Sequence, residues 1–223
     1  MKLRLGVPII PILTIALVGP SCADIASPNR SEAYEWRLIT ATGPGTSDTL
    51  SFHWPRSRLP VRVYSEDSLN LPAHVEHGLQ TWEAAFLYQE FEAEVVADSN
   101  VADIVVRVGS PVKVGFSAGL RRVAAPECEG GTGFDLPAGS SEIQVPVRVF
   151  VNPRFDPSTP GVDECLALTV THELGHAIGI FAHSPDPADI MFSDPVVSEL
   201  SVSDRATVER AYHLNPNLTV APR

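Results

Sequence analysis

HELGHAIGIFAH, residues 172–183, is the stretch that decides how the rest of this 223-residue chain is interpreted. His172 and His176 are four residues apart, so on a helix both side chains project from one face, about one turn apart. Two imidazoles in this arrangement can reach one Zn²⁺ ion at about 2.0–2.1 Å. Glu173 then lies beside the ion, where a general base can take a proton from a water molecule. The spacing predicts a helix that carries two zinc ligands and a catalytic carboxylate.

A glycine and a third histidine complete the pattern. Gly179 allows the chain to leave the helix sharply, because glycine tolerates a positive φ. His183 can then return to the ion as a third ligand. Three protein ligands leave a fourth position open for water, which is typical of a catalytic zinc, whereas four indicate a structural zinc. Two helical histidines at this spacing can occur by chance. Residues 172–183 also place a glutamate, a glycine and a third histidine where zinc chemistry requires them, and chance does not explain the whole set.

These residues resemble the signature of the metzincin zinc metallopeptidases, which is His-Glu-x-x-His-x-x-Gly-x-x-His followed by a methionine turn. Met191 occupies the methionine position, and Ser184 directly after the third histidine resembles the matrixin branch, the matrix-metalloprotease-like group. The resemblance implies that Met191 forms an apolar floor under the imidazoles without binding zinc. Phe192 stands where astacin-like and serralysin-like relatives carry a tyrosine, which argues against those two branches.

The third histidine departs from the family spacing by one residue. The signature places it at Ala182, whereas His183 follows one residue later. The extra residue falls within Ile180–Ala182, beyond the glycine turn, where a loop absorbs it at little cost. The alternative is a gluzincin-like site, whose third ligand is a glutamate on a later helix, and Glu199 is the best-placed candidate.

The order of predicted elements is typical of an α+β fold. Alternating or β-rich patterns predict strands at Pro60–Tyr64, Glu94–Ala97, Asp103–Val108 and Ile143–Val151, with a short edge strand at Leu120–Ala125. Helices are predicted from Leu71 to about Glu90, from Asp163 or Glu164 through the zinc ligands, and over Leu200–Leu214 with a cap at Ser201 or Ser203. The resemblance implies a zincin-like catalytic domain with a twisted mixed β-sheet, an active-site helix and a C-terminal helix.

The chain is expected to contain one catalytic domain behind two N-terminal segments. Residues 1–23 resemble a secretory signal peptide, with a basic start, a short apolar run and small residues after it. Residues 24–55 are predicted to be an extension or linker with one strand around Trp36–Thr40, and residues 56–223 the matrixin-like peptidase domain. Cleavage before Asp24 is one interpretation. In the other, Cys22 is the lipidated first residue of an anchored bacterial lipoprotein.

The net charge and the amino-acid composition limit the kinds of molecule that the protein can bind. The net charge of −11 becomes −13 if Lys2 and Arg4 are removed with the signal. This balance disfavours nucleic acid and anionic membranes, because both require positive charge on the protein. We therefore expect no nucleic-acid partner. The apolar run near the N-terminus is too short and too interrupted by Pro8 and Pro11 to span a membrane. The family resemblance implies a protein or peptide substrate. Lys2 and Lys113 are the only lysines among 16 basic residues, which suggests a GC-rich bacterial genome and a secreted bacterial protein.

The remaining cysteines and acids bear on stability and cofactors. Cys128 and Cys165 are left once Cys22 is cleaved or lipidated, and we expect them to pair in an oxidising compartment; two buried thiols are the alternative. One catalytic Zn²⁺ is the expected cofactor. The loops Gly130–Gly139 and Asp186–Asp189 offer oxygen ligands for Ca²⁺, although solvated acids are the more common explanation.

Together these residues predict a secreted zinc-dependent endopeptidase with Glu173 as its general base. Two alternatives stay open at this point. The first is a zinc hydrolase that acts on a non-protein or cell-wall amide, and the second is a non-catalytic binding protein with a zincin-like fold. The presence of Glu173 argues against the second alternative, since a purely structural zinc site has no need of this carboxylate.

Overall fold

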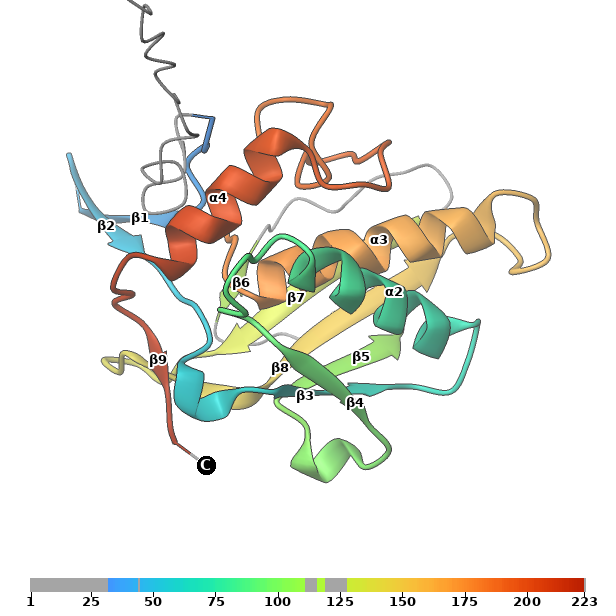
Figure 1. Cartoon of the computed structure of the whole chain (residues 1–223), viewed down its shortest axis with the longest axis horizontal. Helices are drawn as coiled ribbons and strands as arrows, with labels where there is room; N and C mark the ends of the chain where they lie inside the picture. Colours follow the sequence, from blue (N-terminus) through green and yellow to red (C-terminus); the bar gives the residue numbers. More distant parts are fainter. Residues whose placement is uncertain (1–31, 44, 111–115, 119–127, 223) are drawn as a thin grey trace, which may run out of the picture.

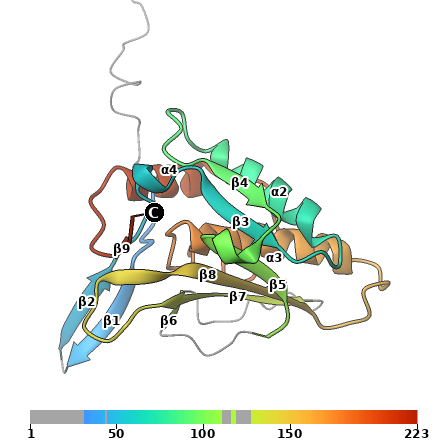
Figure 2. The same cartoon turned by 90° about the horizontal axis from the view of Figure 1, so that it is seen from below.

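The computed structural model describes residues 32–43, 45–110, 116–118 and 128–222. In this part of the chain, three α-helices lie on one side of a twisted mixed β-sheet, which is compatible with the predicted α+β class (Figures 1 and 2). The predicted signal segment with Cys22 and the predicted edge strand Leu120–Ala125 lie outside the described residues.

The main sheet has seven strands in the order β4-β3-β5-β8-β7-β6, with β9 paired to β8. β3, β4, β5, β8 and β9 run parallel, whereas β7 is antiparallel to both β8 and β6. Four predicted strands are confirmed to within two residues at each end, namely β3, β4, β5 and β8. The strands are β3 (Val61–Ser65), β4 (Ala93–Val96), β5 (Ile104–Val108), β6 (Phe116–Ala118), β7 (Cys128–Asp135), β8 (Glu142–Pro153) and β9 (Thr219–Val220).

The prediction of a loop over Gly130–Gly139 is wrong for its first half, because β7 continues to Asp135. Glycine is depleted in strands, and the three glycines of β7 concealed its alternation. Thr132 is buried, and Gly130 packs against the helix that carries the zinc-binding motif. A Cβ atom on Gly130 would lie 2.5 Å from Thr169 Cγ2 and 2.7 Å from Glu173 Oε1. The glycine therefore allows β7 to approach the active-site helix closely.

The three α-helices are α2 (Leu71–Glu83), α3 (Val162–Ala177) and α4 (Val202–Tyr212), and two short 3-10 helices span Arg56–Arg58 and Ser99–Val101. α2 ends seven residues before the predicted Glu90. α3 begins after Gly161 with two acidic residues in its first turn, as predicted. Ser201, one of the two predicted caps, caps α4 through a reciprocal pair of hydrogen bonds with Asp204. Within the described residues, no helix combines the length and apolarity that crossing a membrane requires.

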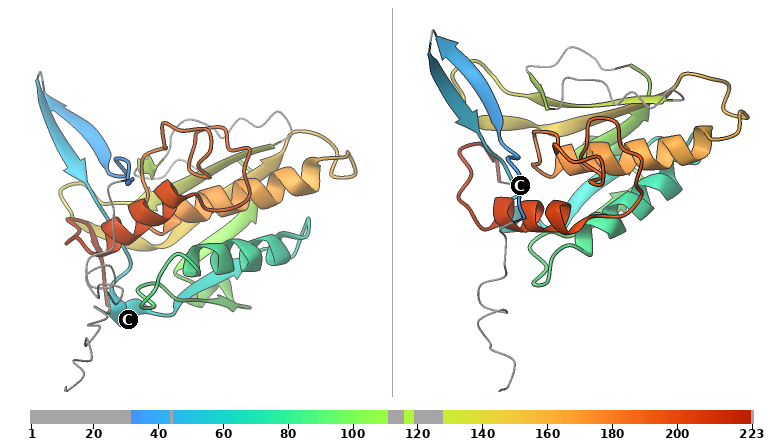
Figure 3. Two further views of the ribbon diagram at one scale, coloured as in Figure 1. Left: turned by 45° about the horizontal axis from the view of Figure 1, so that its top comes forward. Right: turned by 90° about the horizontal axis from the view of Figure 1, so that it is seen from above.

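The N-terminal part of the described chain is packed into the core. A hairpin of β1 (Leu38–Gly43) and β2 (Thr46–Leu50) projects from the body, as Figure 3 shows. The residues that flank this hairpin turn inward, and the exposed fractions of Trp36, Phe52 and Trp54 are only 4%, 1% and 1%. The residues on both sides of the hairpin therefore contribute to the core, although the sequence assigns them to an extension or linker.

The predicted disulfide between Cys128 and Cys165 is confirmed. Both cysteines are buried, their Cα atoms are 6.2 Å apart, and they are separated by 37 residues in sequence. The bond joins the start of β7 to the first turn of α3. It therefore ties together the two elements that carry Thr132 and Glu173.

Loss of this bond is expected to lower the free energy of unfolding by about 4 kcal/mol, because the loop that it closes then regains its conformational entropy in the unfolded chain. Urea denaturation of the Cys128→Ala/Cys165→Ala variant, compared with the oxidised wild-type protein, measures the difference. The wild-type protein under a thiol reductant serves as a second comparison without a change of sequence. Equal stabilities in all three samples would contradict a stabilising role for the bond.

Candidate metal centre

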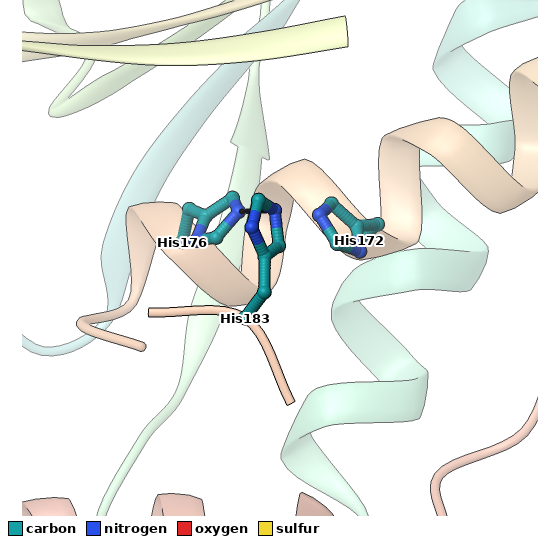
Figure 4. A group of neighbouring side chains, drawn as sticks. All are labelled: His172, His176 and His183. Carbon is teal, nitrogen blue, oxygen red and sulfur yellow. Dashed lines mark hydrogen bonds between the residues drawn. The ribbon is translucent and has the colours of Figure 1, made fainter. Parts of the chain in front are cut away.

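Three histidines converge on one point at the C-terminal half of α3. His172 and His176 project from the helix, and His183 approaches from the loop that follows (Figure 4). One nitrogen of each ring lies within 4.8 Å of those of the other two. His172 and His176 are buried, whereas His183 is half-buried. In the part of the chain that the structure describes, this is the one group of three metal-ligating side chains, and it could hold a metal ion.

Backbone carbonyls orient the two helical imidazoles. Nδ1 of His172 donates to the carbonyl oxygen of Ile190 at 2.7 Å, and Nδ1 of His176 donates to that of Ile180 at 2.5 Å. A carbonyl oxygen only accepts, so the hydrogen of each neutral ring is on Nδ1 and the lone pair is on Nε2. Such contacts fix the tautomer and ring orientation of metal-ligating histidines. Both Nε2 atoms are thus available as ligands.

Burial also keeps these two imidazoles neutral. It lowers the pKa of His172 to about 3, with a further contribution from the charge of His183 and an opposing one from the carbonyl of Ile190. Burial likewise lowers the pKa of His176 well below its usual value, and His172 and His183 add to the effect. Neutral imidazole is the form that binds metal ions, so the two helical histidines are in their ligating form near pH 7.

The carboxylate of Glu173 lies between α3 and β7. Its Oε2 accepts a hydrogen bond from Thr132 Oγ1 at 2.7 Å, and the same hydroxyl lies 2.9 Å from the backbone oxygen of Glu173. Burial raises the pKa of Glu173 to about 8, and the hydrogen bond from Thr132 opposes this shift. The sequence analysis missed Thr132 because it assigned this segment to a loop. No strong local signal marks Thr132, because the glycines around it weaken the strand pattern.

In the metal-free protein, Glu173 is expected to make the fold less stable at alkaline pH. A carboxyl whose folded pKa is about 8, above its ordinary value of 4.5, contributes stability that is present below 4.5 and lost as the pH rises through 8. One pKa unit corresponds to about 1.4 kcal/mol, so the wild-type protein should lose a few kcal/mol relative to Glu173→Gln between about pH 5 and pH 9. Urea denaturation in the presence of a chelator measures this difference. Parallel pH curves for the two proteins would contradict it.

The turn between the second and third histidines depends on Gly179. Its φ is +121°, and a Cβ atom there would collide with the carbonyl oxygen of Phe52. Only glycine fits both conditions without strain. The longer spacing that follows the turn still brings His183 to the other two histidines. Glu199, the alternative third ligand, is exposed and does not belong to the group.

Met191 is buried against α3, close to the two helical histidines. A Cβ atom on Gly175 would collide with Met191 Sδ, so the methionine packs directly against the helix between its two ligands. The backbone oxygen of Met191 accepts from Ser184 N at 2.8 Å, which closes the loop between the third histidine and the methionine. Met191 therefore lies against the part of α3 that carries both histidines, and its role as an apolar floor under the imidazoles stays an implication of the resemblance.

A buried carboxylate, Asp204, organises the same loop from α4. It accepts from Ile190 N at 2.9 Å, from Ser201 N at 3.1 Å and from Tyr34 Oη at 2.9 Å. The carbonyl oxygen of Ile190 accepts the hydrogen bond that orients His172. Asp204 therefore supports His172 indirectly, through the backbone of Ile190. The sequence analysis gives Asp204 no role at the site, because its long-range contacts leave no local pattern.

The acids suggested as calcium ligands have other roles here. Asp135 is the last residue of β7 and so lies in a strand instead of a loop, and Oδ1 of Asp186 accepts from Ala188 N at 2.9 Å. Asp189 accepts a hydrogen bond from the Ser184 hydroxyl. Within the described ranges, none of these acids belongs to a group of three or more metal-ligating side chains.

Comparison with known proteins adds no relative. No protein-family model matches the chain, and the curated proteins contain no match to it.

Proposed function

We propose that this protein is a zinc-dependent endopeptidase of the metzincin type, matrixin-like, with Zn²⁺ held by His172, His176 and His183. One observation carries the proposal: Nε2 of His172 is buried, has no hydrogen-bond partner in the described part of the chain, and belongs to the same group as the other two rings. An unpartnered buried nitrogen costs about 1–3 kcal/mol, which a bound metal ion would offset. Three nitrogen ligands leave one position open, as a catalytic zinc requires.

The spacing of one pair of ligand atoms already fits this ion. Nε2 of His176 and Nε2 of His183 lie 3.3 Å apart. Two nitrogens at about 2.0–2.1 Å from one tetrahedral zinc ion lie roughly 3.3–3.4 Å from each other. The donor set of neutral imidazoles also favours zinc over the hard cations calcium and magnesium, which prefer oxygen ligands.

Zinc bound at these nitrogens supplies Lewis acidity, which polarises a substrate carbonyl and makes a water molecule more acidic. Glu173 is the general base in this proposal: its carboxylate takes the proton of the attacking water and passes it to the leaving amine. Thr132 holds one carboxylate oxygen of Glu173 by its hydroxyl. The carbonyls of Ile190 and Ile180 orient the helical imidazoles, and each of these contacts is made before substrate binds.

A library of end-capped peptides tests the reaction class. Peptides blocked at both termini exclude exopeptidase activity, so internal cuts that vanish with a zinc chelator would establish a zinc endopeptidase. No cuts by protein that carries one zinc ion would overturn the proposal. That result would favour one of the two alternatives, a hydrolase of non-protein or cell-wall amides or a zincin-fold binding protein.

Replacement of Thr132 by valine is expected to lower kcat/KM without weakening zinc binding. The substitution keeps the shape of the side chain but removes the hydroxyl that donates to Glu173. Hydrogen bonds to charged groups contribute about 1.5–3 kcal/mol, so a loss of about tenfold or more is expected. Thr169→Val is the matched control, because Thr169 is equally buried and its hydroxyl contacts Cys128 Sγ instead. Equal kinetics for the two variants would exclude a role for Thr132 in orienting the base.

A further inference from the structure

We propose that Trp36, Phe52 and Trp54, here called the N-terminal clamp, hold the turn between His176 and His183 and thereby set the affinity of the site for its metal ion. The three are positioning residues and do not touch the metal site themselves. This inference rests on the proposed zinc centre and deepens it, since it assigns the pre-organisation of the third ligand to a segment more than a hundred residues earlier in the chain.

The first contact joins two backbone segments. The carbonyl oxygen of Trp36 accepts from Phe181 N at 2.7 Å and from Ala182 N at 2.9 Å. These two amides belong to the stretch that is one residue longer than the metzincin signature. The longer turn is therefore fixed by an acceptor from outside the motif, directly before His183. The Trp36 side chain is itself buried, and the guanidinium groups of Arg37 and Arg210 lie 5.3 and 5.7 Å from its ring.

The second contact is made by Phe52 on the inner side of the same turn. Its ring stacks on that of Phe181, with centroids 6.4 Å apart and an interplanar angle of 8°. Phe134 of β7 meets the edge of Phe181 at 5.1 Å, so the Phe181 ring is enclosed by the clamp and the sheet. The carbonyl oxygen of Phe52 lies against Gly179, at the place where a Cβ atom would stand. Phe52 thus contacts the turn through both its ring and its backbone.

The third contact holds the helical end of the turn. Nε1 of Trp54 donates to the carbonyl oxygen of Ala177, the last residue of α3, at 3.1 Å. The clamp therefore binds the turn at Ala177, Gly179, Phe181 and Ala182, while His176 itself holds Ile180 through Nδ1. The hairpin between Trp36 and Phe52 projects away from the body of the molecule (Figure 3).

His183 needs such a clamp because no helix fixes it. His172 and His176 are held by α3, but His183 follows an irregular turn. A ligand that occupies its binding arrangement for only a fraction of the time raises the apparent dissociation constant by the inverse of that fraction. Loosening the clamp should therefore weaken metal binding through His183 and leave the other two ligands in place.

The test compares two substitutions of equal size at equally buried positions. Phe52→Leu removes the ring that stacks on Phe181, whereas Phe91→Leu truncates a core ring whose aromatic contacts are with Phe86 and Tyr212. Both phenylalanines are 1% exposed. Zinc dissociation constants of the full chain are measured by competition with a chromophoric chelator, after circular dichroism has shown that each variant is folded. Phe52→Leu is expected to raise the constant roughly five- to tenfold. Phe91→Leu is expected to have a clearly smaller effect, because Phe91 reaches the turn only through Tyr212, whose hydroxyl donates to the carbonyl oxygen of Ile178 at 3.2 Å.

Repeating both substitutions in a His183→Ala background separates positioning from general loss of stability. If the clamp acts through His183, Phe52→Leu has no further effect on zinc affinity once His183 is absent. A Phe52→Leu effect of equal size in both backgrounds, or no effect in either, would overturn the inference. Trp54→Phe provides a second variant, since it removes the hydrogen bond to Ala177 and keeps an aromatic ring; a several-fold loss that also depends on His183 is expected.

The outcomes distinguish this inference from the proposed function. Zinc binding that responds to Phe52→Leu only when His183 is present supports the clamp, even if no peptide is cleaved. If neither Phe52→Leu nor Trp54→Phe changes the zinc dissociation constant, the clamp alone is overturned. A wild-type protein that binds no zinc overturns both the clamp and the proposed metal centre.

Discussion

Replacement of Glu173 by glutamine is expected to remove almost all peptide cleavage while the protein keeps its fold and its metal ion. Glutamine has nearly the same shape as glutamate, and its amide oxygen can still accept the hydrogen bond from the Thr132 hydroxyl. It cannot take a proton from the attacking water, however. General acid–base catalysis contributes about 10²–10⁴-fold to rate, so kcat should fall by about that factor. The three histidine ligands are unchanged, so one zinc ion per chain should remain.

Steady-state kinetics and metal analysis on the same preparation check this result. Glu199→Gln is the matched control, because it makes the same chemical change at an exposed position outside the histidine group. It should cleave peptides at the wild-type rate. Near-normal turnover in Glu173→Gln would exclude Glu173 as the base. Loss of zinc together with turnover would instead show that the substitution damages the site as a whole.

Replacement of His183 by alanine is expected to weaken zinc binding tenfold or more. Even outer-shell partners of metal ligands typically contribute about 10–100-fold to affinity, and His183 is a direct ligand in the proposed site. The alternative interpretation, a glutamate from a later segment, predicts that Glu199→Ala has this effect and His183→Ala has little. The position of His183 within the group, and of Glu199 outside it, favours the first outcome.

Chelator competition on both variants decides between the two ligand sets. Wild-type affinity in His183→Ala combined with a large loss in Glu199→Ala would overturn the assignment. Cobalt substitution gives an independent check, because the visible absorption of bound Co²⁺ depends on the number and kind of ligands. The spectrum of His183→Ala should differ from that of the wild-type protein, and the spectrum of Glu199→Ala should not.

The parts of the fold that the sequence predicted correctly are those with a strong local period. The His-x-x-x-His spacing lies on α3, and Ser201 with Asp204 caps α4, because each pattern depends on residues within one or two turns. The buried parallel strands were visible for the same reason, as short runs of β-branched residues. Cys128 and Cys165 could be paired by elimination, since Cys22 lies in the predicted signal.

The parts that were missed depend on contacts between distant segments. The glycines of β7, which allow it to approach α3, also weaken its strand pattern, so the sequence predicts a loop at this place. Thr132 was overlooked with it. Trp36 and Phe52 were assigned to an extension, since nothing near them in sequence shows that they pack on a turn at residues 177–182. Long-range packing of this kind leaves no local period in a single sequence.

The most direct test of a zinc peptidase is a titration of the metal-free protein with Zn²⁺ while cleavage of one capped peptide is followed. We expect no cleavage before zinc is added, a linear rise in rate and a break at one equivalent per chain, as one site formed by His172, His176 and His183 requires. Cleavage by the metal-free protein, or full occupancy of the site without any cleavage, would contradict the proposed function.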